Sequence, residues 1–250
     1  MKNINAIVTA RNTSTRLPNK MLKSICNQKA IDITIARAKM TGFPVILATS
    51  TASSDDIFET IADKAQIKIF RGALRNKLKR WRDCFNYYNI DAALLVDGDD
   101  LLYDYDIGKR AITYLNVTQG DMIVHPENII CGFFTYAIHK KAFPKMSDYT
   151  HDANMDTDVI VEYIKKSQLT TAHLPLNEWE QNRDFRLTLD YQEDLEMFTH
   201  LISQIGYKAS GKEIVDYLEQ HNDIVQMNLF RQKDFLDNQQ RFNQKVLLPD

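Results

Sequence analysis

Residues 10–20 place three cations and three hydroxyl groups directly after a short apolar run, in a segment that reads ARNTSTRLPNK. The cations are Arg11, Arg16 and Lys20, and Ser14 lies between the two arginines. Together they can neutralise a triphosphate, with Ser14 and backbone N–H groups as neutral donors. A basic loop in solvent is the alternative interpretation. The glycine patterns GxxxxGKS/T and GxGxxG are absent, so any nucleotide would be held mostly by side chains.

Carboxylates follow two strand-like segments further along the chain. Asp97, Asp99 and Asp100 end the run ALLVDGDD (93–100), and oxygen ligands of this kind hold Mg²⁺ against substrate phosphates. An ordinary turn explains them equally well, since Asp-Gly and Gly-Asp are common turn dipeptides. Asp190 follows the segment FRLTL (185–189). A helix N-cap is its simplest role, and sharing a metal with Asp99 is the alternative.

Strand-like and helix-like segments alternate over the first half of the chain. The expected strands cover 5–10, 44–50, 67–70, 92–100 and 121–125, and the expected helices cover 32–40, 55–66, 76–88 and 105–117. This alternation predicts an α/β fold with a mainly parallel central sheet flanked by helices. Ligands of such sheets bind at the carboxyl ends of the strands. We therefore expect four polar loops, 11–20, 49–55, 71–76 and 97–100, to face one crevice.

The pattern changes after residue 125. We expect a strand that turns into a short helix over 130–143, a helix over 156–168, a strand, turn and amphipathic helix over 185–202, and another helix over 211–220. Residues 222–250 are rich in Asn, Gln and charge, which suits either a docked tail or an arm for a partner. The expected organisation is a main domain over 1–205, with an insert for acceptor binding or dimerisation within 120–185, and a helical extension over 206–250.

Composition narrows the class of protein. The 250 residues carry a formal net charge of -2, so no overall field attracts nucleic acid or a membrane surface. No apolar run reaches the roughly 18 residues that suggest a membrane span, and the N-terminus shows no signal-peptide pattern. Cys26, Cys84 and Cys131 lie far apart, which fits neither a metal site nor a disulfide framework. We therefore expect a cytoplasmic protein.

Taken in order, these segments resemble the signature of the cytidylyltransferases that make CMP-activated acidic sugars. Family members carry a loop of the form A-R-x-x-S-T-R-L-P-x-K, matched here by residues 10–20. ILATSTASSDD (46–56) and IFRG (69–72) are similar to the family's second and third strand regions, VDGDDLLYD (96–104) to its G-D motif, and RLTLDYQEDLE (186–196) to R-L-T-V-D-x-x-E-D-L-E. The nearest likeness is to the spore-coat SpsF-like branch.

The resemblance implies the Rossmann-like fold of nucleotide-diphospho-sugar transferases, with a smaller antiparallel and helical appendage. It implies transfer of CMP from CTP to an acidic sugar, with release of pyrophosphate and with Mg²⁺ as cofactor. It implies that Arg11, Lys20 and Asp99 are catalytic residues and that Asp99 and Asp190 are metal ligands. The implied nucleotide-binding residues are Ala10, Arg11, Ser14, Arg16, Lys20, Thr49, Arg71 and Asn76. Relatives are commonly dimers, so a homodimer is expected, with the tail residues Leu229, Phe230, Phe235 and Leu236 suited to its interface.

The chain departs from the family pattern at several positions. Thr13 and Asn19 stand where glycine is usual. Asn19 tolerates a positive φ, whereas the β-branched Thr13 is expected to reshape the loop. Leu101 replaces the proline that usually follows the G-D pair, and Asp97 adds a carboxylate to that motif.

The acceptor segment is the most altered part. DTDVIVEY (156–163) replaces an E-H-V-T-P-like stretch, and Asp97, Asp156 and Asp158 are the candidate acceptor-binding residues. The acidic cluster Asp152, Asp156 and Asp158 near an acceptor site disfavours a bare carboxylate and suits an amine, and the alternative is a solvated helix N-terminus with Asp at its caps. Transfer to an amino, phosphate or phosphonate compound therefore stays open, as does a nucleotide-binding partner protein without turnover.

Overall fold

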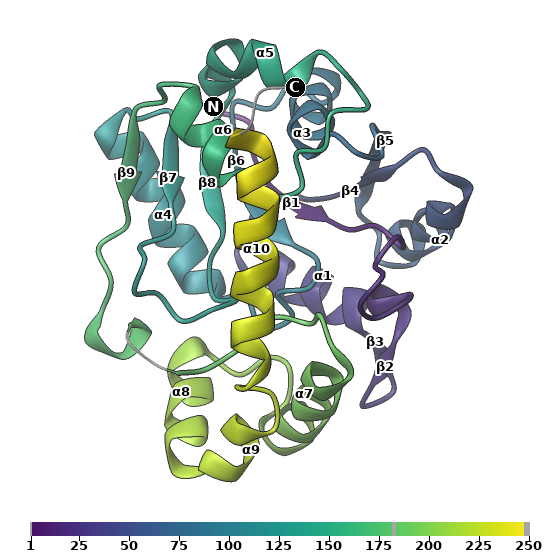
Figure 1. The fold of residues 1–250 in the computed structure, drawn as a ribbon, viewed down its shortest axis with the longest axis vertical. Coiled ribbons are helices and arrows are strands. Elements are labelled where there is room, and N and C mark those ends of the chain that lie inside the picture. The colour runs from purple at the N-terminus through teal and green to yellow at the C-terminus, as the bar shows by residue number, and fades with distance from the viewer. Residues whose placement is uncertain (1, 182–183, 248–250) are drawn as a thin grey trace.

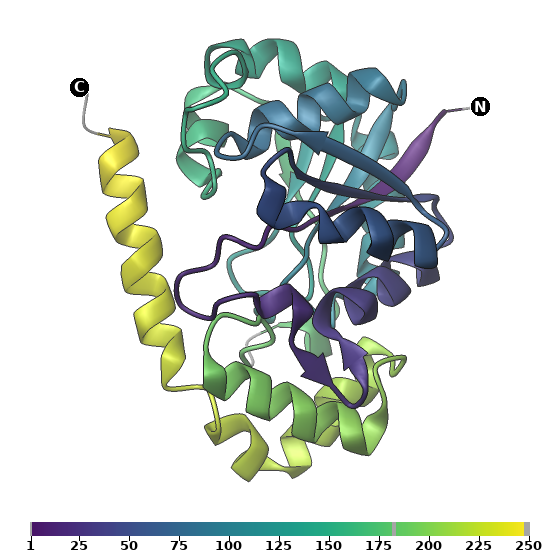
Figure 2. The same ribbon diagram turned by 90° about the vertical axis from the view of Figure 1, so that its right-hand side faces the viewer.

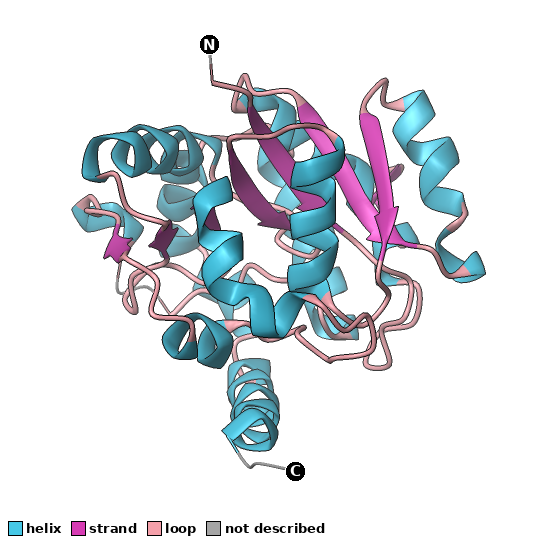
Figure 3. Ribbon diagram, turned by 90° about the horizontal axis from the view of Figure 1, so that it is seen from above, coloured by secondary structure: helices cyan, strands magenta, loops and turns pink. Residues whose placement is uncertain are grey.

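The computed structural model describes residues 2–181 and 184–247, so residues 182–183 of the expected insert and 248–250 of the expected extension lie outside the described residues. Within the described part, seven strands form one sheet in the order β5-β4-β1-β6-β8-β7-β9. Helices cover both faces of this sheet (Figures 1 and 3). The α/β architecture and the mainly parallel sheet are therefore confirmed.

Strand direction defines where a ligand would bind. β1 (Ile4–Thr9) lies between β4 (Val45–Ser50) and β6 (Ala92–Asp97), and β5 (Lys68–Gly72) lies beyond β4; all four strands are parallel. The chain moves from β1 outward to β4 and β5 and then returns to β6 on the other side of β1. The strand order therefore switches between β1 and β6, and the carboxyl ends of these strands mark the expected ligand site.

The far half of the sheet contains the antiparallel strand. β8 (Tyr136–His139) is antiparallel to β6 and to β7 (Met122–Val124), and β9 (Thr171–His173) is parallel to β7. The segment expected to form a strand and a short helix over 130–143 contains β8 followed by a 3-10 helix, η3 (Lys140–Met146).

Alternating side chains of the strands build two cores, one on each face of the sheet. Val8 and Leu94 pack with helices α1 (Ala30–Met40), α2 (Ile57–Lys64) and α4 (Tyr105–Thr118). Ile7 and Leu95 pack on the opposite face with α3 (Lys77–Tyr87), η3 and α6 (Val161–Lys166). Successive residues of a strand point to opposite faces, so buried parallel strands read as continuous apolar runs.

The C-terminal helices extend the first of these cores. Phe198 of α7 (Gln192–Ile205), Ile214 of α8 (Gly211–Gln220) and Val225 of α9 (Asn222–Gln226) belong to the same apolar cluster as β1. The small antiparallel pair β2 (Ser24–Ile25) and β3 (Gln28–Lys29) packs against α7. The last helix, α10 (Arg231–Leu247), runs along the side toward which β1 points and reaches α6 (Figure 2).

Two expected elements are wrong in extent. The helix expected over 156–168 is α6 alone, because the preceding residues form turns in which the Asp158 amide donates to the Asp156 carboxylate. Residues 185–189 form no strand, and an isolated bridge pairs Arg186 with Cys131 instead. The other short helices are α5 (Ser147–Thr150) and the 3-10 helices η1 (Lys20–Leu22), η2 (Ser53–Asp55) and η4 (Glu178–Glu180). None of the described helices combines the length and the apolar character that a membrane crossing needs.

Candidate active site

The candidate crevice lies where the chain leaves β1 and β6, whose last residues Thr9 and Asp97 are paired in register. The amide of Gly98 donates to the Thr9 carbonyl at 2.8 Å, and a Cβ at Gly98 would lie 2.8 Å from the same oxygen. A side chain does not fit there, so glycine is required for this close approach of the two strand ends. Asp99 follows directly and lies beside the loop 10–20.

The ammonium group of Lys20 contacts both Asp99 and Asp190, the two carboxylates that the family resemblance assigns to the metal. Lys20 Nζ lies 2.6 Å from Asp99 Oδ2 and 2.9 Å from Asp190 Oδ1. The Leu189 amide donates to the Asp99 carbonyl at 2.9 Å, which fixes the segment before Asp190 alongside the G-D loop. The structure therefore brings Asp99 and Asp190 together, through a backbone contact rather than as the ends of neighbouring strands.

The surrounding charges keep Lys20 and Asp190 ionised. Burial by itself lowers the pKa of Lys20, but Asp99 and Asp190 outweigh it and raise that pKa above its usual value. Burial raises the pKa of Asp190, but Lys20, Arg16 and Arg186 reverse the effect and leave that pKa below its usual value. The site is an ion-pair network in which a cation separates two carboxylates.

Asp190 is held by two residues that were not assigned to the site from the sequence, Arg186 and Asp194. Arg186 is fully buried; its Nη2 lies 3.2 Å from Asp190 Oδ2, and its Nε donates to Asp194 Oδ1 at 2.9 Å. Asp194 Oδ2 also accepts the Asp190 amide at 2.8 Å. The family motif R-L-T-V-D-x-x-E-D contains both residues and was the available signal in the sequence.

The rest of the loop 10–20 is shaped by its own backbone and by contacts to Asp190. Arg16 Nη2 lies 2.6 Å from Asp190 Oδ1, and its guanidinium lies 5.4 Å from the Tyr191 ring centre. Ser14 Oγ accepts the Leu17 amide at 3.4 Å, while Ala10 is buried at the end of β1. Asn19 has a φ of 55°, as its residue type predicts, whereas Thr13 lies outside the positive-φ region.

Arg11 belongs to a second charged group, on the α3 side of the crevice. Its Nη2 lies 2.7 Å from Asp158 Oδ1, and its Nη1 donates to the Leu74 carbonyl at 2.6 Å. Lys77 Nζ lies 2.7 Å from Asp97 Oδ1. Arg80 is fully buried nearby, and its Nε and Nη2 have no hydrogen-bond partner among the described residues. Lys77 and Arg80 carried no sequence signal beyond their place at the start of a predicted helix.

Three candidate nucleotide-binding residues are buried or engaged by other protein groups, and their role as nucleotide ligands stays a prediction. Arg71 lies 2.6 Å from both Asp56 and Glu59, which ties β5 to the start of α2. Asn76 is fully buried, caps α3 by accepting the Lys79 amide, and donates to two backbone carbonyls of the segment 149–152. Thr49 is also fully buried, inside β4. The expected crevice loops 49–55 and 71–76 therefore contribute mainly structural contacts.

Comparison with known proteins identifies the family. A model of the cytidylyltransferase family matches residues 5–248. The chain belongs to the cytidylyltransferase family. It is similar to the spore coat polysaccharide biosynthesis protein SpsF of Bacillus subtilis, with 24% identity over 90% of this chain and 98% of that protein. It is also similar to an uncharacterised protein of Methanocaldococcus jannaschii, with 23% identity over 92% of this chain and 96% of that protein.

Solved structures agree with the fold of this cytidylyltransferase. A cytidylyltransferase from Leptospira borgpetersenii has a TM-score of 0.82 at 22% identity, covering 90% of this chain and 98% of that one. A CMP:2-keto-3-deoxy-manno-octonic acid synthetase complexed with CTP has a TM-score of 0.62 at 13% identity, covering 81% and 99%. The expected nucleotide-diphospho-sugar transferase fold and the expected likeness to the SpsF-like branch are confirmed.

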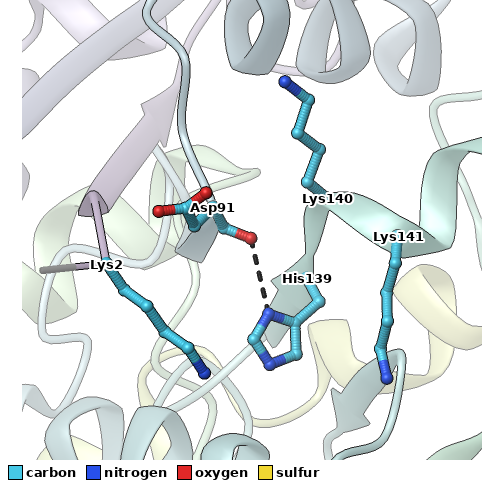
Figure 4. Close-up of a pocket in the computed structure, with 5 residues that line it drawn as sticks. All are labelled: Lys2, Asp91, His139, Lys140 and Lys141. Atoms are coloured by element: carbon cyan, nitrogen blue, oxygen red, sulfur yellow. Dashed lines mark hydrogen bonds between the residues drawn. The ribbon is translucent and has the colours of Figure 1, made fainter.

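The cytidylyltransferase also has a hollow of about 620 Å³ at the ends of its strands that lie opposite the crevice. Lys2, Asp91, His139, Lys140 and Lys141 line it, and the His139 ring nitrogen lies 3.4 Å from the Asp91 carbonyl (Figure 4). Lys2 and Asp91 precede β1 and β6, so this hollow lies at the amino ends of these strands. It is therefore separate from the crevice that contains Asp99 and Lys20.

The donor set of the crevice fits a hard divalent cation bound together with a nucleotide. Among the residues that the structure describes, no group of three or more His, Cys, Asp or Glu side chains is arranged to hold a metal. Mg²⁺ commonly takes only one or two protein carboxylates and fills its remaining positions with water and phosphate oxygens. Asp99 and Asp190 supply two carboxylates that already share a cationic group, Lys20.

Proposed function

We propose that this cytidylyltransferase transfers CMP from CTP to an acidic sugar, a ulosonic or nonulosonic acid, in the biosynthesis of a surface polysaccharide. The observation that carries the proposal is the convergence of Asp99, Asp190 and Lys20 beside the loop 10–20, at the switch point between β1 and β6. The likeness to SpsF, a protein named for polysaccharide biosynthesis, supports the pathway. The likeness in fold to a CMP:2-keto-3-deoxy-manno-octonic acid synthetase supports the acceptor class.

The reaction is a displacement at phosphorus. A hydroxyl oxygen of the acceptor forms a bond to the α-phosphorus of CTP, the bond from that phosphorus to the bridging oxygen breaks, pyrophosphate leaves, and the hydroxyl proton is released. Catalysis of this kind depends mainly on positioning and on stabilisation of negative charge. No covalent intermediate on the protein is required.

The chain's own residues divide this work between them. Arg11, Arg16 and Lys20 supply cationic donors to the triphosphate, and Lys20 stabilises the charge that develops on the α-phosphate and on the leaving pyrophosphate. Asp99 and Asp190 would hold Mg²⁺. The bound ion would neutralise phosphate charge and orient the triphosphate. Arg186 and Asp194 keep Asp190 in place through their hydrogen bonds.

A homodimer is part of this proposal. Phe230 and Leu236 are 59% and 52% exposed, so the tail presents two large apolar side chains to solvent. A second copy that covers them would remove apolar surface from water. Light scattering of the purified chain tests the state directly, and a Leu236→Lys variant that stays dimeric would place the interface elsewhere.

Turnover is tested by measuring pyrophosphate release with CTP, Mg²⁺ and a panel of ulosonic and nonulosonic acids. UTP, ATP and GTP are run in parallel, and amino and phosphonate sugars extend the panel. We expect release with CTP and at least one sugar acid, and loss of that release on chelation of Mg²⁺. Release only with an amine or a phosphonate would replace the acceptor class, and no release with any acceptor would favour a binding protein without turnover.

A further inference from the structure

The segment between α5 and α6 delivers one carboxylate, that of Asp158, to the crevice. The segment is anchored by Thr157, which is fully buried, donates to Asn76 Oδ1 at 3.0 Å and accepts the Leu78 amide at 3.1 Å. Asp158 follows this anchor and lies 2.7 Å from Arg11 Nη2, yet its side chain remains 53% exposed. The backbone is therefore fixed while the carboxylate can leave Arg11 by side-chain rotation alone.

Cations surround this carboxylate. The surrounding protein by itself raises the pKa of Asp158, but Arg11, Lys77, Arg80 and Lys20 together lower it below its usual value. Lys77 already has a partner in Asp97. Arg80 has none for its Nε and Nη2, although the side chain is fully buried. Its Nη1 donates to the Ala73 carbonyl at 2.6 Å, so Arg80 stays in place beneath the crevice and adds positive charge that no carboxylate of the described residues within reach of its unpaired nitrogens neutralises.

We propose that the Asp158 carboxylate occupies the position of a substrate anion on Arg11. When substrate binds, a carboxylate or phosphate oxygen displaces Asp158 and binds Arg11, with Arg80 adding positive charge nearby. A carboxylate and a phosphate both present paired oxygens to a guanidinium, so either can replace the Asp158 contact. The proposal rests on the proposed function, because the displacing anion belongs either to CTP or to the acidic acceptor. It reverses the expectation that Asp158 disfavours an acidic acceptor.

An alternative is that the Arg11–Asp158 pair serves folding only. Ion pairs with a half-exposed partner contribute little to stability, so removing this carboxylate leaves the fold intact. The Asp158 carboxylate and an incoming anion compete for Arg11. In Asp158→Asn the anion no longer has to displace a charged group. The two interpretations therefore differ in the effect of the variant on anion binding.

The test compares Asp158→Asn with Asp148→Asn, which removes the same charge from an exposed position on α5. Three probes are titrated by calorimetry at one ionic strength: inorganic phosphate alone, CTP with Mg²⁺, and 2-keto-3-deoxy-manno-octonic acid with saturating CMP. We expect Asp158→Asn to bind phosphate and one substrate roughly two- to fivefold more tightly than the wild type, the range set by an exposed ion pair. Asp148→Asn is expected to bind as the wild type does.

The pattern of tightening identifies the source of the anion. Tighter CTP assigns the subsite to a nucleotide phosphate, and a tighter sugar acid assigns it to the acceptor carboxylate. Equal effects in both variants, unchanged or weaker binding of all probes, or tightening confined to inorganic phosphate would overturn the proposal. A failure of the proposed function is seen separately, as absence of pyrophosphate release by the wild type, and leaves the phosphate titration interpretable.

Discussion

Lys20 and Asp190 lie 170 positions apart in the sequence, and the ammonium of one is 2.9 Å from the carboxylate of the other. The same ammonium lies 2.6 Å from Asp99. The contact joins the loop after β1 to the segment before α7 and places the G-D motif between them. Lys20 therefore holds the two carboxylates next to each other.

Replacing Lys20 removes the cation from this arrangement. We expect Lys20→Ala to lower kcat/KM for CTP by about tenfold to a hundredfold, since a charge-assisted hydrogen bond to phosphate is worth roughly 1.5–3 kcal/mol. Steady-state pyrophosphate release measures the change. Lys23→Ala, which removes the same charge three positions later, is the control. Equal activity of the two variants would show that Lys20 does not contact the triphosphate.

The buried pair of Arg186 with Asp190 and Asp194 predicts a large loss of stability. Arg186→Met removes the cation that pairs with the buried Asp194, while Asp190 keeps Lys20 and Arg16, and breaking a buried pair from one side costs about 3–5 kcal/mol. Urea unfolding measures the free energy of unfolding. Arg231→Ala breaks only partly exposed pairs with Glu193 and Asp234 and should cost no more than about 1 kcal/mol. A small loss in Arg186→Met would mean that Asp194 finds another partner.

Arg71 gives a test of the predicted nucleotide-binding set. Its guanidinium is engaged by Asp56, Glu59 and the backbone carbonyls of Ser50 and Ala52. We expect Arg71→Ala to lower stability by about 1 kcal/mol and to leave the Kd for CTP unchanged in a calorimetric titration. A clear weakening of CTP binding would restore Arg71 as a nucleotide ligand.

Asp121 gives a stability prediction far from the crevice. Burial raises the pKa of Asp121, but Lys145, the Thr170 amide and Lys141 outweigh it and lower that pKa below its usual value. A depressed pKa contributes stability that is present above the unfolded pKa of 3.8 and is lost as the pH falls through the folded pKa. The free energy of unfolding should therefore fall less between pH 6 and pH 3 in Asp121→Asn than in the wild type. Urea unfolding at several pH values measures it, and parallel pH dependences of the two proteins would contradict a lowered pKa of Asp121.

The sequence predicts the parallel half of the fold well because its signals are local. Buried strands such as β1 and β6 read as continuous apolar runs, and polar loops follow them directly. The loop 10–20 and the G-D motif could thus be placed at one edge of the sheet. The local pattern favoured a helix N-cap for Asp190, and the family motif decided for a metal shared with Asp99. The segment before Asp190 is an irregular chain held by backbone hydrogen bonds from Leu187 to Cys131 and from Leu189 to Asp99.

Other features of the crevice depend on distant partners that no local pattern reveals. Arg11 meets Asp158 across 147 positions, and Asn76 meets Thr157 across 81. A polar residue that follows a strand can face a ligand or can tie two loops together, and Asn76 does the second. Arg80 lies on the expected helix 76–88, and no local pattern marks it, because its full burial arises only from packing against neighbouring elements.

Magnesium-dependent CTP binding to the Asp99–Asp190 pair tests the account most directly. Calorimetric titration of CTP, with and without Mg²⁺, is compared among the wild type, Asp99→Asn, Asp190→Asn and the control Asp216→Asn, which removes a half-exposed carboxylate on α8. Unfolding curves first show that all four proteins are folded. The account predicts that Mg²⁺ tightens CTP binding in the wild type and in Asp216→Asn, and that this tightening is lost in both site variants. Equal tightening by Mg²⁺ in all four proteins would contradict it.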